Sequence, residues 1–269
     1  MTAPNYICPI CQSSLLLTDK TFRCENNHCF DYAKEGYVHL LPVQNKKSLM
    51  PGDDKNMVMA RRAFLEKGFY QHLRAQLLDS LGELAEQQVV DLGCGEGYYT
   101  NELQRINPNA AVYGVDISKA AVKYASKRNK AVHYSVATNA LLPFADGSTD
   151  LIVNIFAPIS ASECARILKT SSKLVTVTPG ENHLFELKQF IYDAPEKHQQ
   201  AAVPEGFEQA SMTVNEHQAS VDDAEDLNNL LLMTPFGWKI TQDKKAKLLA
   251  SLPLNLTLSF NLTEYQIKS

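Results

Sequence analysis

A short apolar run that leads directly into a glycine-rich turn constrains this chain more than any other feature. In Val89–Thr100, the letters VVDL are followed by Gly93, Gly95 and Gly97. Glycine accepts positive φ and lets a ligand lie against the backbone, and the helix expected next offers unpaired N–H groups at its N-terminus. Asp116 ends the following apolar run, 19 residues after Gly97. A carboxylate at that position can accept hydrogen bonds from ribose hydroxyls, so the pattern predicts a nucleoside site.

Apolar runs and helical patterns alternate after residue 86, which predicts an α/β fold. The expected strands are 89–92, 111–115, 131–136, 150–156 and 174–178, and the expected helices among them are 118–128 and 161–168. This order favours a mostly parallel, Rossmann-like sheet covered on both faces. Alternation at 254–262 predicts one late antiparallel strand. Further helices are expected within 56–84, where Gly68 separates two of them, and at 183–193, 222–233 and 242–250.

The spacing of the glycines distinguishes two classes of cofactor. Dinucleotide enzymes typically carry G-x-G-x-x-G, whereas here the third glycine comes one residue earlier and Asp91 precedes the turn. This resembles motif I of the class I methyltransferases, which implies S-adenosylmethionine as cofactor and Asp116 as the ribose-binding acid. The alternative is an ordinary tight turn with a structural aspartate. Cys94 and Cys164 are interpreted as packing residues, although a nucleophilic cysteine is the other possibility.

Four cysteines in the first 29 residues predict a metal site. Cys8 and Cys11 form a C-x₂-C pair, and Cys24 follows with His28 at C-x₃-H spacing. Such a set suits tetrahedral Zn²⁺, and Cys29 is an alternative fourth ligand. The other interpretation is a loop with free cysteines. Because a closed zinc shell leaves no open position, the site would serve structure or recognition and not catalysis.

Further motifs extend across most of the chain. They are CPxC at 8–11, CxxxHxFDxAKEGYVxLL at 24–41, ARRxFLxxGxY at 60–70, DxGCGEGYYT at 91–100, LPF at 142–144, TPG and HL within 178–184, and MTPF with a tryptophan within 233–238. The combination resembles the bacterial 23S rRNA guanine-N1 methyltransferases. That family joins a zinc-binding module to a class I methyltransferase domain.

The resemblance implies a domain division and a set of site residues. We expect a zinc-binding RNA-recognition module at 1–42, a linker at 43–60 and the methyltransferase domain at 61–269. Zinc would be held by Cys8, Cys11, Cys24 and His28, with Cys29 outside the ligand set. The residues expected to bind the cofactor are Tyr70, Gly93, Gly95, Glu96, Gly97, Asp116 and His183.

The resemblance also implies a reaction, in which guanine N1 in a 23S rRNA hairpin attacks the sulfonium methyl group. The sequence identifies no catalytic residue, and it lacks the N/D-P-P-Y/F tetrapeptide typical of exocyclic amino methylation. Two alternatives remain open. One is a small-molecule methyltransferase acting on quinone-like acceptors, and the other is a non-enzymatic rRNA-binding or assembly factor.

Charge places limits on how RNA would be bound. The formal net charge of −4 gives no global basic field, so phosphates would meet local patches. Lys119, Lys123 and Lys127 share one helix face, although a solvated face is the simpler interpretation. Arg61-Arg62 and Lys46-Lys47 add charge near the expected zinc module.

The chain has no apolar run of the roughly 20 residues that a membrane helix needs, and its first residues lack a signal-peptide pattern. We therefore expect a cytoplasmic protein with no membrane partner. A homodimer is expected from the resemblance alone.

Overall fold

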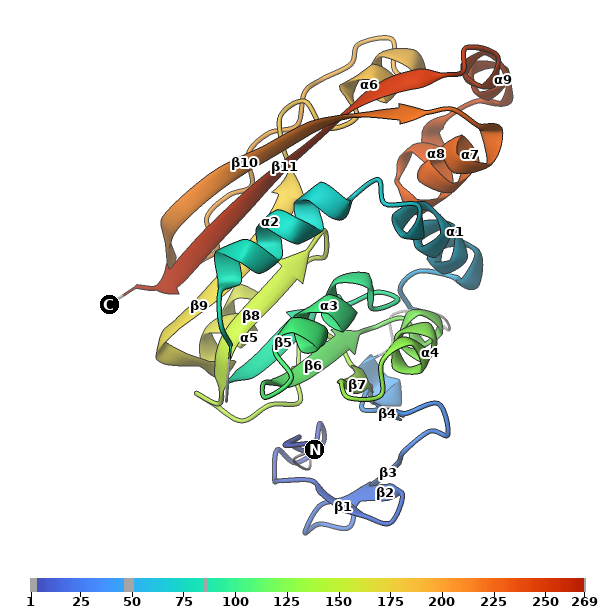
Figure 1. Ribbon diagram of the computed structural model, residues 1–269. Helices are drawn as coiled ribbons and strands as arrows, with labels where there is room; N and C mark the ends of the chain where they lie inside the picture. Colours follow the sequence, from blue (N-terminus) through green and yellow to red (C-terminus); the bar gives the residue numbers. More distant parts are fainter. Residues whose placement is uncertain (1–3, 46–50, 85–86, 269) are drawn as a thin grey trace.

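The computed structural model describes residues 4–45, 51–84 and 87–268, and it is built around an eight-stranded sheet (Figure 1). In order across the sheet, the strands are β10 (Phe207–Val221), β11 (Leu254–Ile267), β9 (Leu168–Pro179), β8 (Thr149–Ile155), β5 (Gln88–Leu92), β6 (Ala111–Asp116), β7 (His133–Val136) and β4 (Tyr37–His39). Neighbouring strands are parallel except at β11, which is antiparallel to both β9 and β10. The prediction of a mostly parallel sheet with one late antiparallel strand is confirmed.

Apolar cores on both faces explain why the central strands are apolar throughout. On β5, Val89 belongs to one core and Val90 to the opposite one, and Val112 and Tyr113 divide in the same way on β6. Strands buried on both faces have continuous apolar sequences, as expected for a parallel sheet. The edge strand β10 was not predicted, because most of its side chains are exposed and polar.

Helices cover both faces of this sheet. They are α1 (Lys55–Glu66), α2 (Gln71–Leu81), α3 (Tyr98–Ile106), α4 (Lys119–Arg128), α5 (Ala161–Ile167), α6 (Phe185–Ile191), α7 (Ala224–Met233), α8 (Phe236–Lys239) and α9 (Gln242–Ala250). Figure 1 shows α2, α3 and α4 in front of the sheet and α5 behind it. In the described part of the chain, no helix combines the length and apolar character needed to span a membrane.

The segment expected to be a linker is only partly a loop. A short 3₁₀ helix, η1 (Val43–Asn45), opens it, and α1 begins at Lys55, five residues before the expected end at residue 60. The helix starts there because the Asp54 side chain accepts hydrogen bonds from the backbone N–H groups of Asn56 and Met57, which is a typical N-cap.

The N-terminal region forms a small sheet that is attached to the large one. Strands β1 (Leu16–Thr18), β2 (Thr21–Arg23) and β3 (Cys29–Asp31) are antiparallel, while β4 pairs with β7 in the main sheet. Tyr6 packs edge-to-face on Tyr113 of β6, and the Ile7 N–H donates to the carbonyl oxygen of Pro143 at 3.0 Å. The module expected at 1–42 therefore shares a strand and a core with the rest of the protein.

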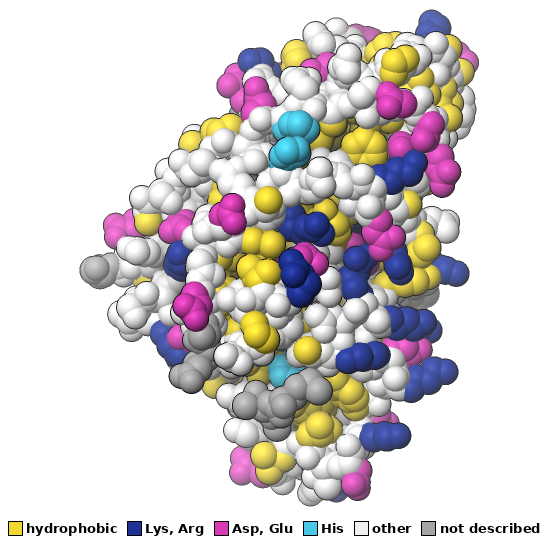
Figure 2. All heavy atoms as spheres, viewed as in Figure 1, with side chains coloured by type: hydrophobic (Ala, Val, Ile, Leu, Met, Phe, Trp, Pro, Cys, Tyr) yellow, Lys and Arg dark blue, Asp and Glu magenta, His cyan; other side chains and the backbone are white. Residues whose placement is uncertain are grey.

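Lysine and arginine side chains line the right-hand edge of Figure 2, over α1, α4 and the N-terminal region. On α4, Lys119, Lys123 and Lys127 are all exposed, as their shared helix face requires. Lys123 lies 3.2 Å from the carboxylate of Glu35, so part of this charge holds the N-terminal region in place.

The strand order creates a crevice next to β5. From β5 the chain continues to β6 and β7, and it then returns to β8 on the other side of β5. At such a reversal the loops after the two strands lead in opposite directions, which opens a binding site at their carboxyl ends. The Asn154 side chain of β8 donates to the carbonyl oxygen of Leu92 at 2.8 Å and joins the two strand ends.

Candidate functional site

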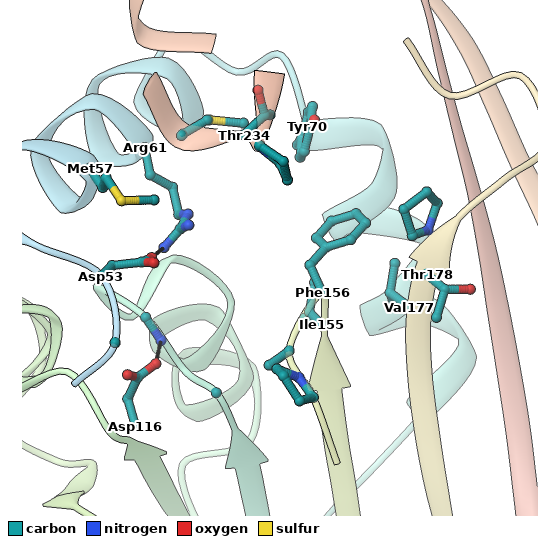
Figure 3. Close-up of a pocket in the computed structure, with 18 of the residues that line it drawn as sticks. Asp53, Met57, Arg61, Tyr70, Asp116, Ile155, Phe156, Val177, Thr178 and Thr234 are labelled. Atoms are coloured by element: carbon teal, nitrogen blue, oxygen red, sulfur yellow. Dashed lines mark hydrogen bonds and ion pairs between the residues drawn. The ribbon is translucent and has the colours of Figure 1, made fainter. Parts of the chain in front are cut away.

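A cavity of about 1230 Å³ opens at the carboxyl ends of β5, β6, β8 and β9 (Figure 3). Sites for one small molecule typically have about 300–1000 Å³. The cavity is therefore large enough for a cofactor together with a second ligand. Of the residues expected to bind a cofactor, all except Gly97 line it.

The glycine-rich turn forms the floor of this cavity. Gly93 has φ +82°, and a Cβ atom on it would lie 2.2 Å from the Cβ atom of Ala157. Only glycine allows this close approach of two loops. Gly97 lies outside the cavity lining, because it precedes α3 and packs against Ala125 and Tyr134.

Asp116 connects the end of β6 to the turn. One carboxylate oxygen accepts a hydrogen bond from the Gly95 N–H at 2.9 Å, and the other accepts from the Ser118 N–H at 2.7 Å. Burial raises the pKa of this carboxyl group, whereas the two backbone hydrogen bonds lower it. Each carboxylate oxygen can accept a second hydrogen bond, so ribose hydroxyls in the cavity could still bind here.

Two further carboxyl groups lie beside the turn and are almost completely buried. Asp91, 1% exposed, accepts a hydrogen bond from the Thr100 hydroxyl, and burial raises its pKa to about 7. Burial also raises the pKa of Glu96, whose nearest charged partner is Arg128 at 3.6 Å. Buried carboxyl groups at the floor of a cavity favour a positively charged ligand, since its charge would offset their mutual repulsion.

His183 and Tyr70 meet on the opposite wall. The Nδ1 atom of His183 accepts from the Ser259 N–H at 3.3 Å, so the proton of the neutral ring is on Nε2, which lies 3.4 Å from the Tyr70 hydroxyl. Burial lowers the pKa of His183 to about 3. The imidazole is therefore neutral at physiological pH and donates to Tyr70, whose own proton is free to bind a ligand.

Asp53 and Arg61 also line this cavity, although the sequence pattern does not mark them as site residues. They form an ion pair on the cavity wall, and a Cβ atom on Gly95 would lie 3.9 Å from Nη1 of Arg61. Its place in the sequence indicates only that Arg61 adds charge near the zinc module, whereas α1 directs its side chain into the cavity (Figure 3). The one available signal was its position inside the ARRxFLxxGxY motif. Lys46 and Lys47 lie outside the described residues.

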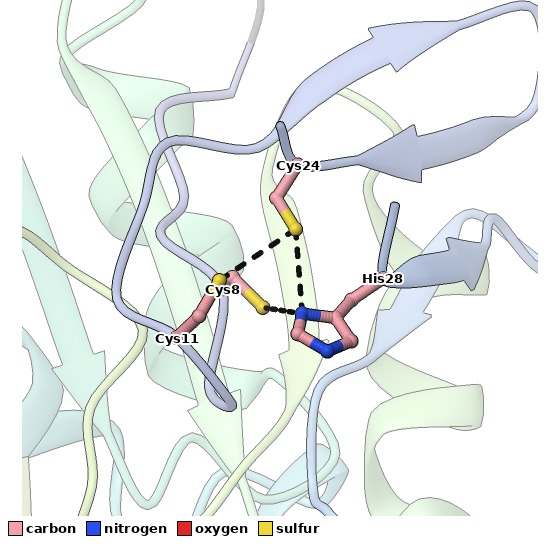
Figure 4. Close-up of side chains that lie close together, drawn as sticks. All are labelled: Cys8, Cys11, Cys24 and His28. Atoms are coloured by element: carbon pink, nitrogen blue, oxygen red, sulfur yellow. Dashed lines mark hydrogen bonds between the residues drawn. The ribbon is translucent and has the colours of Figure 1, made fainter. Parts of the chain in front are cut away.

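The N-terminal cluster has the geometry of a tetrahedral metal site (Figure 4). The Nδ1 atom of His28 lies 3.5 Å from the sulfur of Cys8 and 3.4 Å from that of Cys24, and the sulfurs of Cys11 and Cys24 are 3.7 Å apart. Tetrahedral zinc with ordinary bond lengths requires about 3.5 Å between nitrogen and sulfur and about 3.8 Å between sulfurs. The donor set therefore fits zinc. The exposed thiol of Cys29 instead points to the Asn27 carbonyl oxygen at 3.3 Å.

The remaining cysteines are poor nucleophiles. Cys94 and Cys164 are both buried. Burial raises the pKa of Cys94 well above its usual value and that of Cys164 to about 12. Since the thiolate is the reactive form, this environment favours the interpretation of both residues as packing residues.

Comparisons with known proteins agree with this two-part architecture. Residues 6–49 match the zinc-ribbon family described as "RlmA, N-terminal", and residues 89–178 match the family "Methyltransferase domain". Among solved structures, YcgJ from Bacillus subtilis superposes with a TM-score of 0.51 at 18% identity and covers 74% of this chain and 99% of its own. The fold and cavity are those of an S-adenosylmethionine-dependent methyltransferase that also carries a zinc module.

Full-length relatives identify the family. The chain is 32% identical over 267 residues to the 23S rRNA (guanine(748)-N(1))-methyltransferase of Streptomyces fradiae, covering 95% of this chain and 94% of that protein. The protein belongs to the family of 23S rRNA (guanine-N1)-methyltransferases. By contrast, the demethylmenaquinone methyltransferase of Tropheryma whipplei (strain Twist) is 33% identical over 132 residues, which are 46% of this chain and 52% of that protein.

Proposed function

We propose that this enzyme methylates N1 of a guanine in a hairpin loop of 23S rRNA. The observation that carries the proposal is the pairing of β4 with β7, which fixes the zinc module to the same sheet as the cofactor cavity. A module held in this way can orient RNA relative to the reacting atoms. The volume of the cavity, about 1230 Å³, leaves room for a base beside the cofactor.

The cavity wall offers a partner for each part of the cofactor. Asp116 is placed to accept hydrogen bonds from the ribose, and Ala137 lines the adjacent wall where adenine would pack. The guanidinium of Arg61, next to Gly95, is suited to the carboxylate of the methionine part. The Tyr70 hydroxyl can donate a hydrogen bond to the same carboxylate.

Methyl transfer depends more on the orientation of the two reactants than on a reactive side chain. S-Adenosylmethionine, when bound, supplies a methyl group already activated by a positively charged sulfur. The buried carboxyl groups of Asp91 and Glu96 would favour that positive charge, and the rest of the cavity would orient the acceptor base toward the bound cofactor. Guanine N1 must also lose a proton. His183 is unsuited to take it, because Nδ1 already accepts a hydrogen bond and the pKa of the ring is about 3.

Cys8, Cys11, Cys24 and His28 would hold the zinc ion. Four protein ligands close the coordination shell, so zinc would stabilise the module and take no part in methyl transfer. The homodimer expected from the resemblance stays a prediction that sedimentation analysis can test. The cytoplasmic location also stays a prediction, and it follows from the proposed ribosomal RNA substrate.

Cofactor affinity should depend on pH through Asp91. Its pKa of about 7 lies above the ordinary value of 3.8, so the carboxyl group is largely protonated at pH 6. A cationic cofactor lowers that pKa, and binding must then release protons. We expect affinity to rise about threefold to tenfold between pH 5.5 and 7, since one pKa unit corresponds to a factor of ten in affinity. Titration calorimetry at pH 6.5 in buffers with different ionisation enthalpies measures the protons released. Asp91→Asn should release fewer protons, and an unchanged release would contradict this assignment.

A direct test separates the proposed function from its alternatives. Purified protein, S-adenosylmethionine and unmodified 23S rRNA hairpins should give methylated RNA, whereas quinone-like acceptors should not react. A small-molecule methyltransferase is the second candidate, because a demethylmenaquinone methyltransferase matches 46% of the chain. Absence of methyl transfer to any RNA would reject our proposal, and absence of cofactor binding would favour a non-enzymatic rRNA-binding factor.

A further inference from the structure

Phe156 has an unusual conformation at the edge of the cavity. It follows the last residue of β8 and has φ +56°, a backbone conformation that bulky side chains rarely adopt. Its side chain lines the cavity and is 42% exposed, although burying a phenylalanine would be favourable. Strained residues of this kind persist when their surroundings hold them, and they cluster at functional sites.

The surroundings of Phe156 fix it relative to the cofactor loop. Its N–H donates to the carbonyl oxygen of Val177 at 3.0 Å, and the following residue, Ala157, fits against Gly93 where a Cβ atom would clash at 2.2 Å. On the far side of the turn, the Asn139 side chain donates to the carbonyl oxygen of Pro158 at 2.7 Å. A ligand that contacts Phe156 is therefore held at a set position relative to the glycine-rich turn.

The Phe156 ring is supported by other rings around one part of the cavity. It lies nearly parallel to His183, with an interplanar angle of 26° and centroids 6.1 Å apart, and it meets Phe260 edge-to-face at 5.7 Å. Figure 3 shows the ring projecting into the space between Tyr70 and Thr178. The exposed part of the ring is thus an apolar surface inside a cavity that is too large for the cofactor alone.

We propose that Phe156 is the platform on which the acceptor base stacks after it leaves the RNA loop. This inference rests on the proposed function and adds to it a binding site for a planar purine. N1 lies on the Watson–Crick edge of guanine, so the base must be unpaired or flipped to reach the methyl group. Stacking on an aromatic ring tolerates any base. Phe156 would therefore set the position of the base, while polar contacts select guanine.

The test is a double-mutant cycle on binding. We would measure the affinity of wild type and Phe156→Leu for two hairpins, one with the guanine that wild type methylates and one with an abasic nucleotide there. The cost of unstacking the base is the same for both proteins and cancels in the cycle. We expect the base to contribute about 10- to 100-fold more to binding in wild type than in Phe156→Leu. Phe156→Tyr should restore this difference.

Matched variants distinguish stacking from a structural role. Phe190, 36% exposed, is absent from the cavity lining, so Phe190→Leu should behave as wild type. Trp238, 74% exposed, does line the cavity. The proposal is overturned if Phe156→Leu keeps the full base dependence, or if Trp238→Leu abolishes it in place of Phe156→Leu. If wild type does not bind or methylate the hairpin that contains the guanine, the proposed function fails first.

Discussion

Replacing Asp116 by alanine is expected to weaken S-adenosylmethionine binding by about a hundredfold or more. Hydrogen bonds to a charged group contribute about 1.5–3 kcal/mol each, and every 1.4 kcal/mol is a factor of ten in affinity. Without the carboxylate, the ribose hydroxyls would lose their hydrogen-bond acceptor. The Gly95 N–H would also lose the acceptor that shapes the turn. Titration calorimetry with the purified protein measures the change directly.

Asp150 provides a matched control at the amino end of β8, away from the carboxyl ends of the strands where the cavity lies. Its carboxylate also accepts a backbone hydrogen bond, from the Gln88 N–H at 2.9 Å, and it pairs with Lys169. Asp150→Ala should therefore lower the thermal unfolding temperature without weakening cofactor binding. If Asp116→Ala bound the cofactor within about threefold of wild type, a difference below 1 kcal/mol, Asp116 would not be the ribose-binding acid.

Mutation of one zinc ligand should remove the metal completely, whereas mutation of its neighbour should not. Cys24→Ser is expected to bind no zinc, and Cys29→Ser is expected to keep one zinc per chain. Structural zinc contributes about 10–16 kcal/mol in small zinc-binding peptides, which is as large as the stability of many entire domains. Elemental analysis of the purified variants gives the zinc content.

The same pair of variants tests whether the module folds around the metal. Cys24 is buried and Cys29 is exposed. Proteolysis of the N-terminal region should therefore become faster in Cys24→Ser and stay unchanged in Cys29→Ser. His28→Ala should resemble Cys24→Ser. Loss of zinc from Cys29→Ser, with retention in His28→Ala, would mean that Cys29 is the fourth ligand.

Features with a local chemical signature could be predicted from the sequence. The glycine-rich turn, Asp116 at the end of the next strand and the C-x₂-C pair each depend on a few neighbouring residues. The parallel strands could be predicted because burial on both faces makes them apolar throughout. The ambiguity between His28 and Cys29 could not be resolved from spacing, since it depends on which side chain turns toward Cys8 and Cys24.

Features that depend on distant contacts could not be predicted. Strand β4 joins the main sheet only through pairing with β7, about a hundred residues later in the sequence. Arg61 faces the cavity because of how α1 packs, and Phe156 has positive φ because the surrounding loops hold it. The resemblance alone named His183 and Tyr70 as cofactor-binding residues. The structure shows that both line the cavity and that a hydrogen bond joins the imidazole to the buried hydroxyl, and their role in cofactor binding stays a prediction.

The central claim is that this enzyme places a methyl group on N1 of a guanine in 23S rRNA. The most direct test is mass mapping of modified nucleosides after unmodified 23S rRNA is incubated with the zinc-loaded protein and S-adenosylmethionine. We predict 1-methylguanosine at one hairpin-loop position, and much less of it with Asp116→Ala at a limiting concentration of S-adenosylmethionine. Unmodified RNA, or a methyl group on cytosine or on an exocyclic nitrogen, would contradict the claim.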